Sequence, residues 1–275
     1  MLDFSYMQTH LGSVSLALFG HTLLYVAAAV FIYMTFWFLV SLITKKMDVA
    51  DTAWGLGFVV AVLVPLLLYG VQFDRALFAF ILVFIWGTRL SLHITKRNAG
   101  RPEDKRYAAM RADWGSGFLL RSYLQVFLLQ GGLLLLVVSP VLFIATYRGG
   151  ALGVFDIIGA AVWLFGFFFE SQGDAQLRKF LATPDHGPVM DQGLWKYTRH
   201  PNYFGEVTQW WGLWIIALGV PFGYLGIIGP LTITGLILFV SGVPLLEKSM
   251  AGKPAWEAYK KRTSVFIPLP PRKAA

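Results

Sequence analysis

The stretch Tyr197–Glu206 (YTRHPNYFGE) gathers hydrogen-bonding side chains directly before an apolar, tryptophan-rich run. Pro201 suits the first turn of a helix, where its missing N–H leaves no bond unmade. Asn202 and Glu206 would then lie one turn apart on the same helix face. Together they can bind a carboxamide, because such a group presents one acceptor oxygen and one NH2 donor. The alternative is a polar helix start that leads into a belt of tryptophans at a membrane interface.

Asp48 and Asp51 open another apolar run, in the sequence MDVADTAWG. An ionisable group in a membrane segment indicates function, because its removal from water is unfavourable. The alternative is a structural role, since acidic residues at a helix start cap free N–H groups and complement the helix dipole.

A third polar cluster ends the apolar run that reaches Arg89 and His93, which are four residues apart. The loop that follows is rich in side chains suited to binding phosphate through bidentate contacts. These are Arg97, Asn98, Arg101, Arg106 and Arg111. The alternative is a solvated basic loop with snorkelling side chains.

A fourth cluster places Glu170, Asp174 and Arg178 along one helical stripe at intervals of four residues. A plain salt bridge between neighbouring turns explains this spacing. Two carboxylates directed into one helix bundle also suit the ribose and amide groups of a nucleotide.

The composition identifies an integral membrane protein with many crossings. Of the 275 residues, 56% are hydrophobic and only 14% are charged, whereas soluble domains carry about 25% charged residues. Several apolar runs approach the roughly 20 residues that cross a bilayer as a helix. The absence of cysteine excludes disulfides, thiolate catalysis and cysteine-ligated zinc or iron–sulfur sites.

We predict an all-α, seven-helix transmembrane bundle that forms a single domain over residues 1–275, with a cytoplasmic tail at 247–275. The predicted spans are 20–43, 52–70, 75–95, 124–146, 153–173, 203–221 and 224–246. With this count nearly all lysines and arginines outside the spans fall on one side, and the other side receives only Arg75 and Arg148. The positive-inside rule therefore places the N-terminus outside and the C-terminus in the cytoplasm. The net charge of +8 follows from the same rule, so we expect no nucleic-acid partner.

All four polar clusters lie toward the predicted cytoplasmic side. We therefore expect a cavity that opens to the cytoplasm and has an apolar interior. Such a cavity suits a charged cofactor that enters from water and a lipophilic substrate that enters from the bilayer.

Three segments resemble the DUF1295 proteins, bacterial relatives of the steroid 5α-reductases and sterol C14-reductases. They are GLWKYTRHPNYFGE, WGTRLSLHITKRNAGRPEDKRY and AYKKRTSVFIPLP. The resemblance runs from about residue 48 to residue 268. A shorter RHPxYxG pattern also occurs in isoprenylcysteine carboxyl methyltransferase and related membrane enzymes that use S-adenosylmethionine. The methyltransferases generally lack the pair at Asn202 and Glu206, which favours the reductases.

The resemblance implies NADPH as the cofactor and assigns roles to individual residues. Asn202 and Glu206 would hold the nicotinamide carboxamide, and Asp174, with Arg178 nearby, would bind the adenosine side. The remaining cofactor-binding candidates are Asn98, Arg101, Arg111, Tyr197, Arg199, His200, Tyr203 and Tyr259.

The resemblance places catalytic candidates at Asp51 and Trp86. His93 is a third candidate, as an alternative hydrogen-bond donor. The steroid reductases have a glutamine before a glutamate where this chain has Ala50 before Asp51, and their tyrosine partner falls at Trp86. These two departures argue against a 3-oxo steroid as substrate. The predicted reaction is hydride transfer to a polarised C=C bond of a lipophilic compound, with the developing enolate stabilised by a protonated Asp51, by His93 or by Tyr107.

Two other classes of protein use the same features. A methyltransferase would place Arg199, His200 and Tyr203 around S-adenosylmethionine. A transporter or lipid-binding scaffold would use the cavity without chemistry. The oligomeric state stays open at this point.

Overall fold

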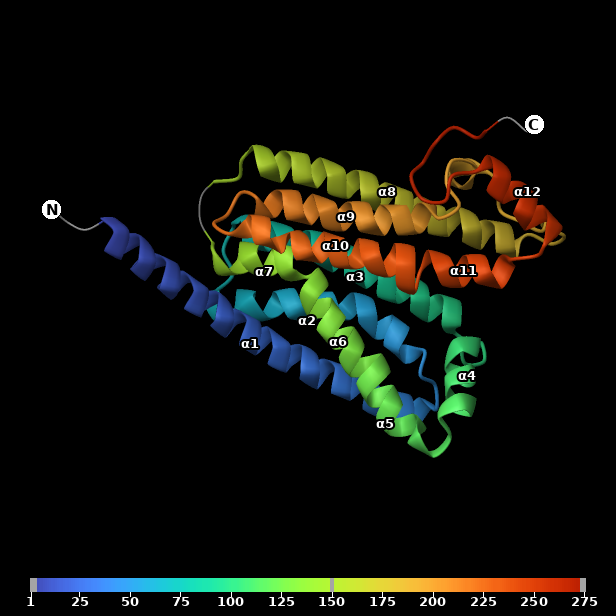
Figure 1. Ribbon diagram of the computed structural model, residues 1–275, viewed down its shortest axis with the longest axis horizontal. Helices are drawn as coiled ribbons and strands as arrows, with labels where there is room; N and C mark the ends of the chain where they lie inside the picture. The colour runs from blue at the N-terminus through green and yellow to red at the C-terminus, as the bar shows by residue number, and fades with distance from the viewer. Residues whose placement is uncertain (1–3, 149–150, 273–275) are drawn as a thin grey trace. The chain divides into compact units, whose positions relative to one another are not determined.

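The computed structural model describes residues 4–148 and 151–272, with side chains from residue 17 onward, and these residues fold into helices (Figure 1). The α-helices are α1 (Phe4–Thr44), α2 (Val49–Tyr69), α3 (Arg75–Asn98), α4 (Lys105–Trp114), α5 (Phe118–Ser122), α6 (Leu129–Val137), α7 (Ser139–Thr146), α8 (Val154–Ala182), α9 (Pro201–Ala217), α10 (Ile228–Gly235), α11 (Val243–Met250) and α12 (Pro254–Arg262). Short 3₁₀ segments are η1 (Gly115–Gly117), η3 (Gly193–Lys196) and η4 (Gly223–Ile227). Two segments are π-helical: η2 (Tyr123–Leu128) continues into α6, and η5 (Leu236–Val240) follows α10.

Within the described residues, six helical stretches are long and apolar enough to cross a membrane. They are Ala17–Thr44, Val49–Tyr69, Arg75–Asn98, Lys105–Val137, Val154–Ala182 and Gly223–Met250. The seventh predicted span, 203–221, corresponds to α9, which has 17 residues and is shorter than these six. The protein is therefore an all-α, multi-pass integral membrane protein, as its composition predicts.

The predicted fourth span, 124–146, differs from the structure. The helical run there begins earlier, at Lys105, and ends at Val137. The chain then turns at Val138 and continues as α7, with Pro140 in its first turn. Pro140 has no N–H to continue the preceding helix and suits the first turn of a new one, so the sequence SPV marks the break. The predicted last span, 224–246, is likewise interrupted, at Ser241 and Gly242.

The chain forms two compact units. Unit 1 comprises Met1–Leu152 and Ala217–Gly226, and unit 2 comprises Gly153–Ile216 and Ile227–Ala275. The single membrane domain expected from the sequence stays a prediction.

In unit 1, α2 and α3 pack closely because glycines face each other. A Cβ atom on Gly55 would lie 2.5 Å from the carbonyl oxygen of Gly87. Beside this contact the Ser91 hydroxyl donates to the carbonyl oxygen of Thr52 at 2.8 Å and accepts from the amide of Leu56 at 3.0 Å. Small residues allow such backbone approach in membrane helices, and hydroxyl groups join the helices across it.

Two arginines of unit 1 join segments that connect its helices. The guanidinium of Arg75 donates to the carbonyl oxygens of Gly219 at 2.8 Å and Ala151 at 3.1 Å. Arg148 pairs with Asp74 at 2.9 Å, and Asp74 in turn caps α3 by accepting from the amide of Leu77. These two arginines are those that the predicted topology places on the side with few charges.

In unit 2, α8 and α9 run side by side (Figure 1) and meet at two glycine pairs. A Cβ atom on Gly166 would lie 2.6 Å from the carbonyl oxygen of Gly205, and one on Gly212 would lie 2.7 Å from that of Gly159. The two backbones therefore approach as closely as they do only because these positions lack side chains.

We expect Gly205→Ala to destabilise the protein by roughly 1–3 kcal/mol, because its Cβ would overlap the backbone of α8 at Glu170. The matched control is Gly235→Ala, a helical glycine with open space around its Cβ position. That change should stabilise by about 0.4–1 kcal/mol. Thermal unfolding in one detergent compares the variants, and a Gly205→Ala protein as stable as wild type would contradict the close contact.

Candidate functional site

Polar side chains lie along the contact between α8 and α9. The Asn202 side-chain amide donates to Asp174 at 3.0 Å, and that of Gln209 donates to Glu170 at 2.5 Å. Glu170 is only 2% exposed and Asp174 only 7%. Buried carboxylates in a membrane helix are unfavourable unless paired, and they commonly mark a site of function.

Asn202 and Glu206 occupy the first two turns of α9, which begins at Pro201 as the sequence predicts. A carboxylate only accepts hydrogen bonds, so the amide nitrogen of Asn202 faces Asp174 and its oxygen is the acceptor that remains. Glu206 is buried one turn further along the helix. Asn202 and Glu206 thus lie four residues apart, on one face of the first turns of α9.

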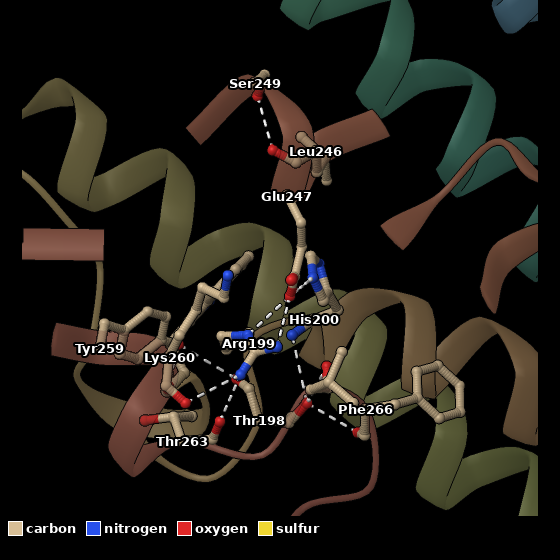
Figure 2. Close-up of polar contacts among 12 residues, drawn as sticks. Thr198, Arg199, His200, Leu246, Glu247, Ser249, Tyr259, Lys260, Thr263 and Phe266 are labelled. Carbon is tan, nitrogen blue, oxygen red and sulfur yellow. Dashed lines mark hydrogen bonds and ion pairs between the residues drawn. The ribbon is translucent and has the colours of Figure 1, made fainter. Parts of the chain in front are cut away.

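Arg199 lies directly before α9 and is almost fully engaged (Figure 2). Its guanidinium reaches Glu247 with two nitrogens, at 2.8 and 2.7 Å. A third nitrogen donates to the carbonyl oxygen of Thr263 at 2.7 Å. Arg199 therefore joins the start of α9 to α11 and to the end of α12.

His200 packs beside this ion pair (Figure 2) and is 2% exposed. Its Nε2 lies 3.4 Å from Glu247, and its ring stacks on Tyr203 with 5.7 Å between centroids. Burial lowers the pKa of His200 to about 4, although the neighbouring Glu247 carboxylate opposes the shift. The imidazole is consequently neutral at physiological pH. Its Nδ1 is buried and has no hydrogen-bond partner among the described residues.

The C-terminal tail runs along the segment before α9. The Thr198 hydroxyl donates to the carbonyl oxygen of Phe266 at 2.7 Å (Figure 2), and a parallel bridge joins Thr198 to Ser264. The Tyr259 hydroxyl donates to the carbonyl oxygen of Trp195 at 2.5 Å, and burial raises the pKa of this phenol. The tail thereby fixes the backbone that carries Arg199 and His200.

Two cofactor candidates of unit 2, Arg178 and Tyr197, have exposed side chains. Arg178 is exposed on the last turns of α8, and the Tyr197 side chain is 43% exposed. The carbonyl oxygen of Tyr197 accepts from the amide of Leu269, so its backbone is held by the tail while its ring faces outward.

In unit 1, Asp51 accepts hydrogen bonds on both carboxylate oxygens. The Tyr107 hydroxyl donates to Oδ1 at 2.9 Å, and Arg106 donates to Oδ2 at 2.9 Å. Asp51 is therefore the acceptor in both of these contacts. Of the donors considered from the sequence, Tyr107 is the one that the structure brings to Asp51.

The other unit 1 candidates lie on α3 and α4. Trp86 is buried edge-to-face on Phe58, with 5.3 Å between centroids, and His93 is half-buried on α3. Arg111 pairs with Glu103 at 3.1 Å, and its guanidinium also lies over the Phe118 ring.

The loop after α3 holds the remaining candidates. Asn98 accepts from the Arg97 guanidinium at 3.1 Å, and the carbonyl oxygen of Arg101 accepts from Lys46 at 2.5 Å. The Arg101 side chain is exposed.

Asp48 stands at the cap position of α2 without a capping hydrogen bond from its side chain, and burial raises its pKa.

Sequence reasoning missed two residues of unit 2. Gln209 follows Asn202 by seven residues and Glu206 by three, so helical periodicity predicts it on the same face. Glu247 is the one acidic residue near the end of the last apolar run, and the rule for ionisable groups in membrane segments would have identified it.

The fold and these sites define a multi-pass membrane protein with buried polar clusters near helix ends. The chain belongs to the family described as "Protein of unknown function (DUF1295)", whose model matches residues 37–263. Neither a curated protein nor a solved structure matches the chain.

Proposed function

We propose that the protein is a membrane-embedded reductase that uses NADPH to reduce a C=C bond in a lipophilic, enone-like or sterol-like substrate. The observation that carries the proposal is the start of α9, where Asp174 orients Asn202 and Glu206 follows one turn later. This arrangement fits a nicotinamide carboxamide, whose NH2 group has two hydrogens for the Asn202 oxygen and the Glu206 carboxylate.

The contact between Asp174 and Asn202 refines the assignment that the family resemblance implies. Residues 3.0 Å apart cannot contact opposite ends of an extended dinucleotide. We therefore assign Asp174 to the nicotinamide end, as the residue that orients Asn202, and no longer to the adenosine side. Arg101, Arg111 and Asn98 belong to unit 1, and their roles toward phosphate and ribose groups stay as the family resemblance implies them.

Asp51 and Tyr107 are assigned to the substrate. When bound, NADPH supplies a hydride to the β-carbon of the polarised C=C bond. The electron pair of that bond would move toward the carbonyl oxygen, and a proton from water would reach the α-carbon and complete the reduction. Tyr107 has one O–H, which Asp51 accepts in the free protein. Tyr107 would stabilise the developing enolate when the substrate carbonyl replaces Asp51 as its acceptor.

Two alternative functions use the same residues. A methyltransferase would use Arg199, His200 and Tyr203 around S-adenosylmethionine, and a transporter or lipid-binding protein would perform no chemistry. The engagement of Arg199 by Glu247 and the tail carbonyls supports a structural role for Arg199, which the methyltransferase would use and which the reductase interpretation also assigns to the cofactor.

We also propose that α9 crosses the membrane as a seventh span, with the N-terminus outside and the C-terminus in the cytoplasm. Its 17 residues lie at the lower limit for a spanning helix. The distribution of lysines and arginines supports this count, because an even number of spans would place basic segments on both sides.

Glu206→Ala should weaken NADPH binding by at least about tenfold, because a charged hydrogen-bond acceptor is lost. Glu206→Gln keeps the shape of the side chain and one acceptor, so its NADPH affinity should lie between those of wild type and Glu206→Ala. Thr208→Ala is the matched control, since its hydroxyl bonds only the carbonyl oxygen of Phe204 on the same helix. Titration of the purified protein with NADPH measures the affinities, and an unchanged affinity of Glu206→Ala would remove the assigned role.

Asp51→Asn and Tyr107→Phe should each lower turnover by about a hundredfold and change NADPH affinity much less, because both residues act on the substrate. Asp113→Asn, an exposed carboxyl on α4, is the control. The assay follows NADPH oxidation with a substrate identified by screening enones, sterols and polyprenyl compounds. Turnover that survives in both variants would contradict their role.

The seventh span is tested with single cysteines, since the chain has none of its own. Tyr224→Cys should react with a membrane-impermeant maleimide on intact cells, whereas His186→Cys should react only after lysis. Both positions are exposed and lie on either side of α9 in the sequence. Labelling of both from the same side would exclude a crossing by α9.

A further inference from the structure

The tail after α12 presents three aliphatic side chains away from the protein. Val265, Ile267 and Leu269 are 41%, 61% and 52% exposed, whereas the residues between them are half-buried. Single exposed aliphatic residues are common on proteins, but a group of them within five positions indicates a contact with an apolar partner. We call these three side chains the aliphatic cluster.

The rest of unit 2 holds the backbone of the aliphatic cluster in place. The Thr198 hydroxyl donates to the carbonyl oxygen of Phe266 at 2.7 Å (Figure 2), and the Phe266 ring packs edge-on against Phe204, with 5.7 Å between centroids. The amide of Leu269 donates to the carbonyl oxygen of Tyr197 at 3.0 Å. The cluster is therefore exposed although the segment that carries it is anchored on both sides.

These anchors place the cluster beside the end of a membrane helix. Tyr197 and Thr198 come shortly before α9, and the next residue, Arg199, pairs with Glu247. Glu247 lies three residues, or about 4.5 Å of helix, before the end of the apolar stretch Gly223–Met250. The cluster is thus close to the level at which this helix reaches the lipid headgroups.

Basic residues lie on both sides of the cluster in the sequence. Residues 251–272 contain Lys253, Lys260, Lys261, Arg262 and Arg272, against the single acidic residue Glu257. Lys261 and Arg272 are exposed and form no ion pair among the residues that the structure describes. The amide of Arg272 donates to the carbonyl oxygen of Arg262 at 2.9 Å, which brings the far end of the tail back to the end of α12.

Apolar side chains beside unpaired cations match the chemistry of an anionic lipid surface, where acyl chains lie directly beneath negative headgroups. A protein partner fits less well. Three aliphatic side chains offer only a small part of the roughly 800 Å² that each partner buries in a stable interface. Prolines at 268, 270 and 271 remove backbone N–H donors, so the segment is a poor edge for an added β-strand.

We propose that the aliphatic cluster inserts into an anionic lipid surface and that Lys261 and Arg272 bind its headgroups. The tail is then a membrane-surface anchor as well as the support of the segment before α9. This role does not depend on the proposed reductase activity.

A fluorophore on Ile267→Cys of the full chain tests the insertion, since the chain has no cysteine of its own. The protein is reconstituted into vesicles of phosphatidylcholine, alone or with an equal part of phosphatidylglycerol, and each with or without nitroxide-bearing lipid. We expect the lipid nitroxide to quench this label, and to quench it more strongly when phosphatidylglycerol is present. A label on Ala258→Cys, an exposed position of α12 outside the cluster, should be quenched less.

Three results would overturn the insertion. If a water-soluble quencher on both sides of the vesicle reaches the Ile267→Cys label and the lipid nitroxide does not, the cluster lies in water. If neither quencher reaches the label, a protein surface covers the cluster. If the Ile267→Cys and Ala258→Cys labels are quenched equally by the lipid nitroxide, the cluster is not the part of the tail that enters the bilayer.

Neutralised cations test the headgroup contacts in the labelled Ile267→Cys chain. Lys261→Gln and Arg272→Gln should each lower the ratio of inserted to free tail about fivefold in vesicles with phosphatidylglycerol. Lys179→Gln is the matched control, because this exposed cation lies on α8 outside the tail, and it should leave the quenching unchanged.

Salt gives an independent readout of the same contacts. Raising the salt concentration from about 0.1 M to 1 M shortens the Debye length from about 10 Å to 3 Å, so it should lower the quenching as neutralisation does. Quenching that changes neither with the two substitutions nor with salt would overturn the role of Lys261 and Arg272.

Discussion

The close approach of α8 and α9 is the constraint on which the architecture of unit 2 depends. Gly159, Gly166, Gly205 and Gly212 leave room for backbone against backbone. At this distance short side chains reach across, so Asn202 bonds Asp174 directly. A larger residue at any of these glycines would separate the helices and leave the buried carboxylates without partners, which is strongly unfavourable in a membrane.

The ion pair of Arg199 with Glu247 is the second requirement. Removal of one partner from a buried pair leaves an uncompensated charge, which typically costs roughly 3–5 kcal/mol. Here the pair also joins α9 to α11 and to the tail through the carbonyl oxygen of Thr263. The same carboxylate also lies 3.4 Å from Nε2 of His200, so the ion pair contributes to the position of this imidazole.

The sequence predicted local features well and long-range pairs poorly. The helix start at Pro201 and the shared face of Asn202 and Glu206 follow from residue type and spacing. The contact of Asp51 with Tyr107 joins residues 56 apart in the chain, and that of Arg199 with Glu247 joins residues 48 apart. No periodicity encodes such pairs. Pro140 indicates a helix break, but the sequence is strongly apolar on both sides of it, so one continuous span was predicted.

The central claim is that the α8–α9 region binds a nicotinamide nucleotide. The most direct test is mass spectrometry of the small molecules released from protein purified in mild detergent without added cofactor. The account predicts recovery of NADP(H), and much less of it from the Glu206→Ala variant. Recovery of S-adenosylmethionine without NADP(H) would contradict the account and favour methyl transfer.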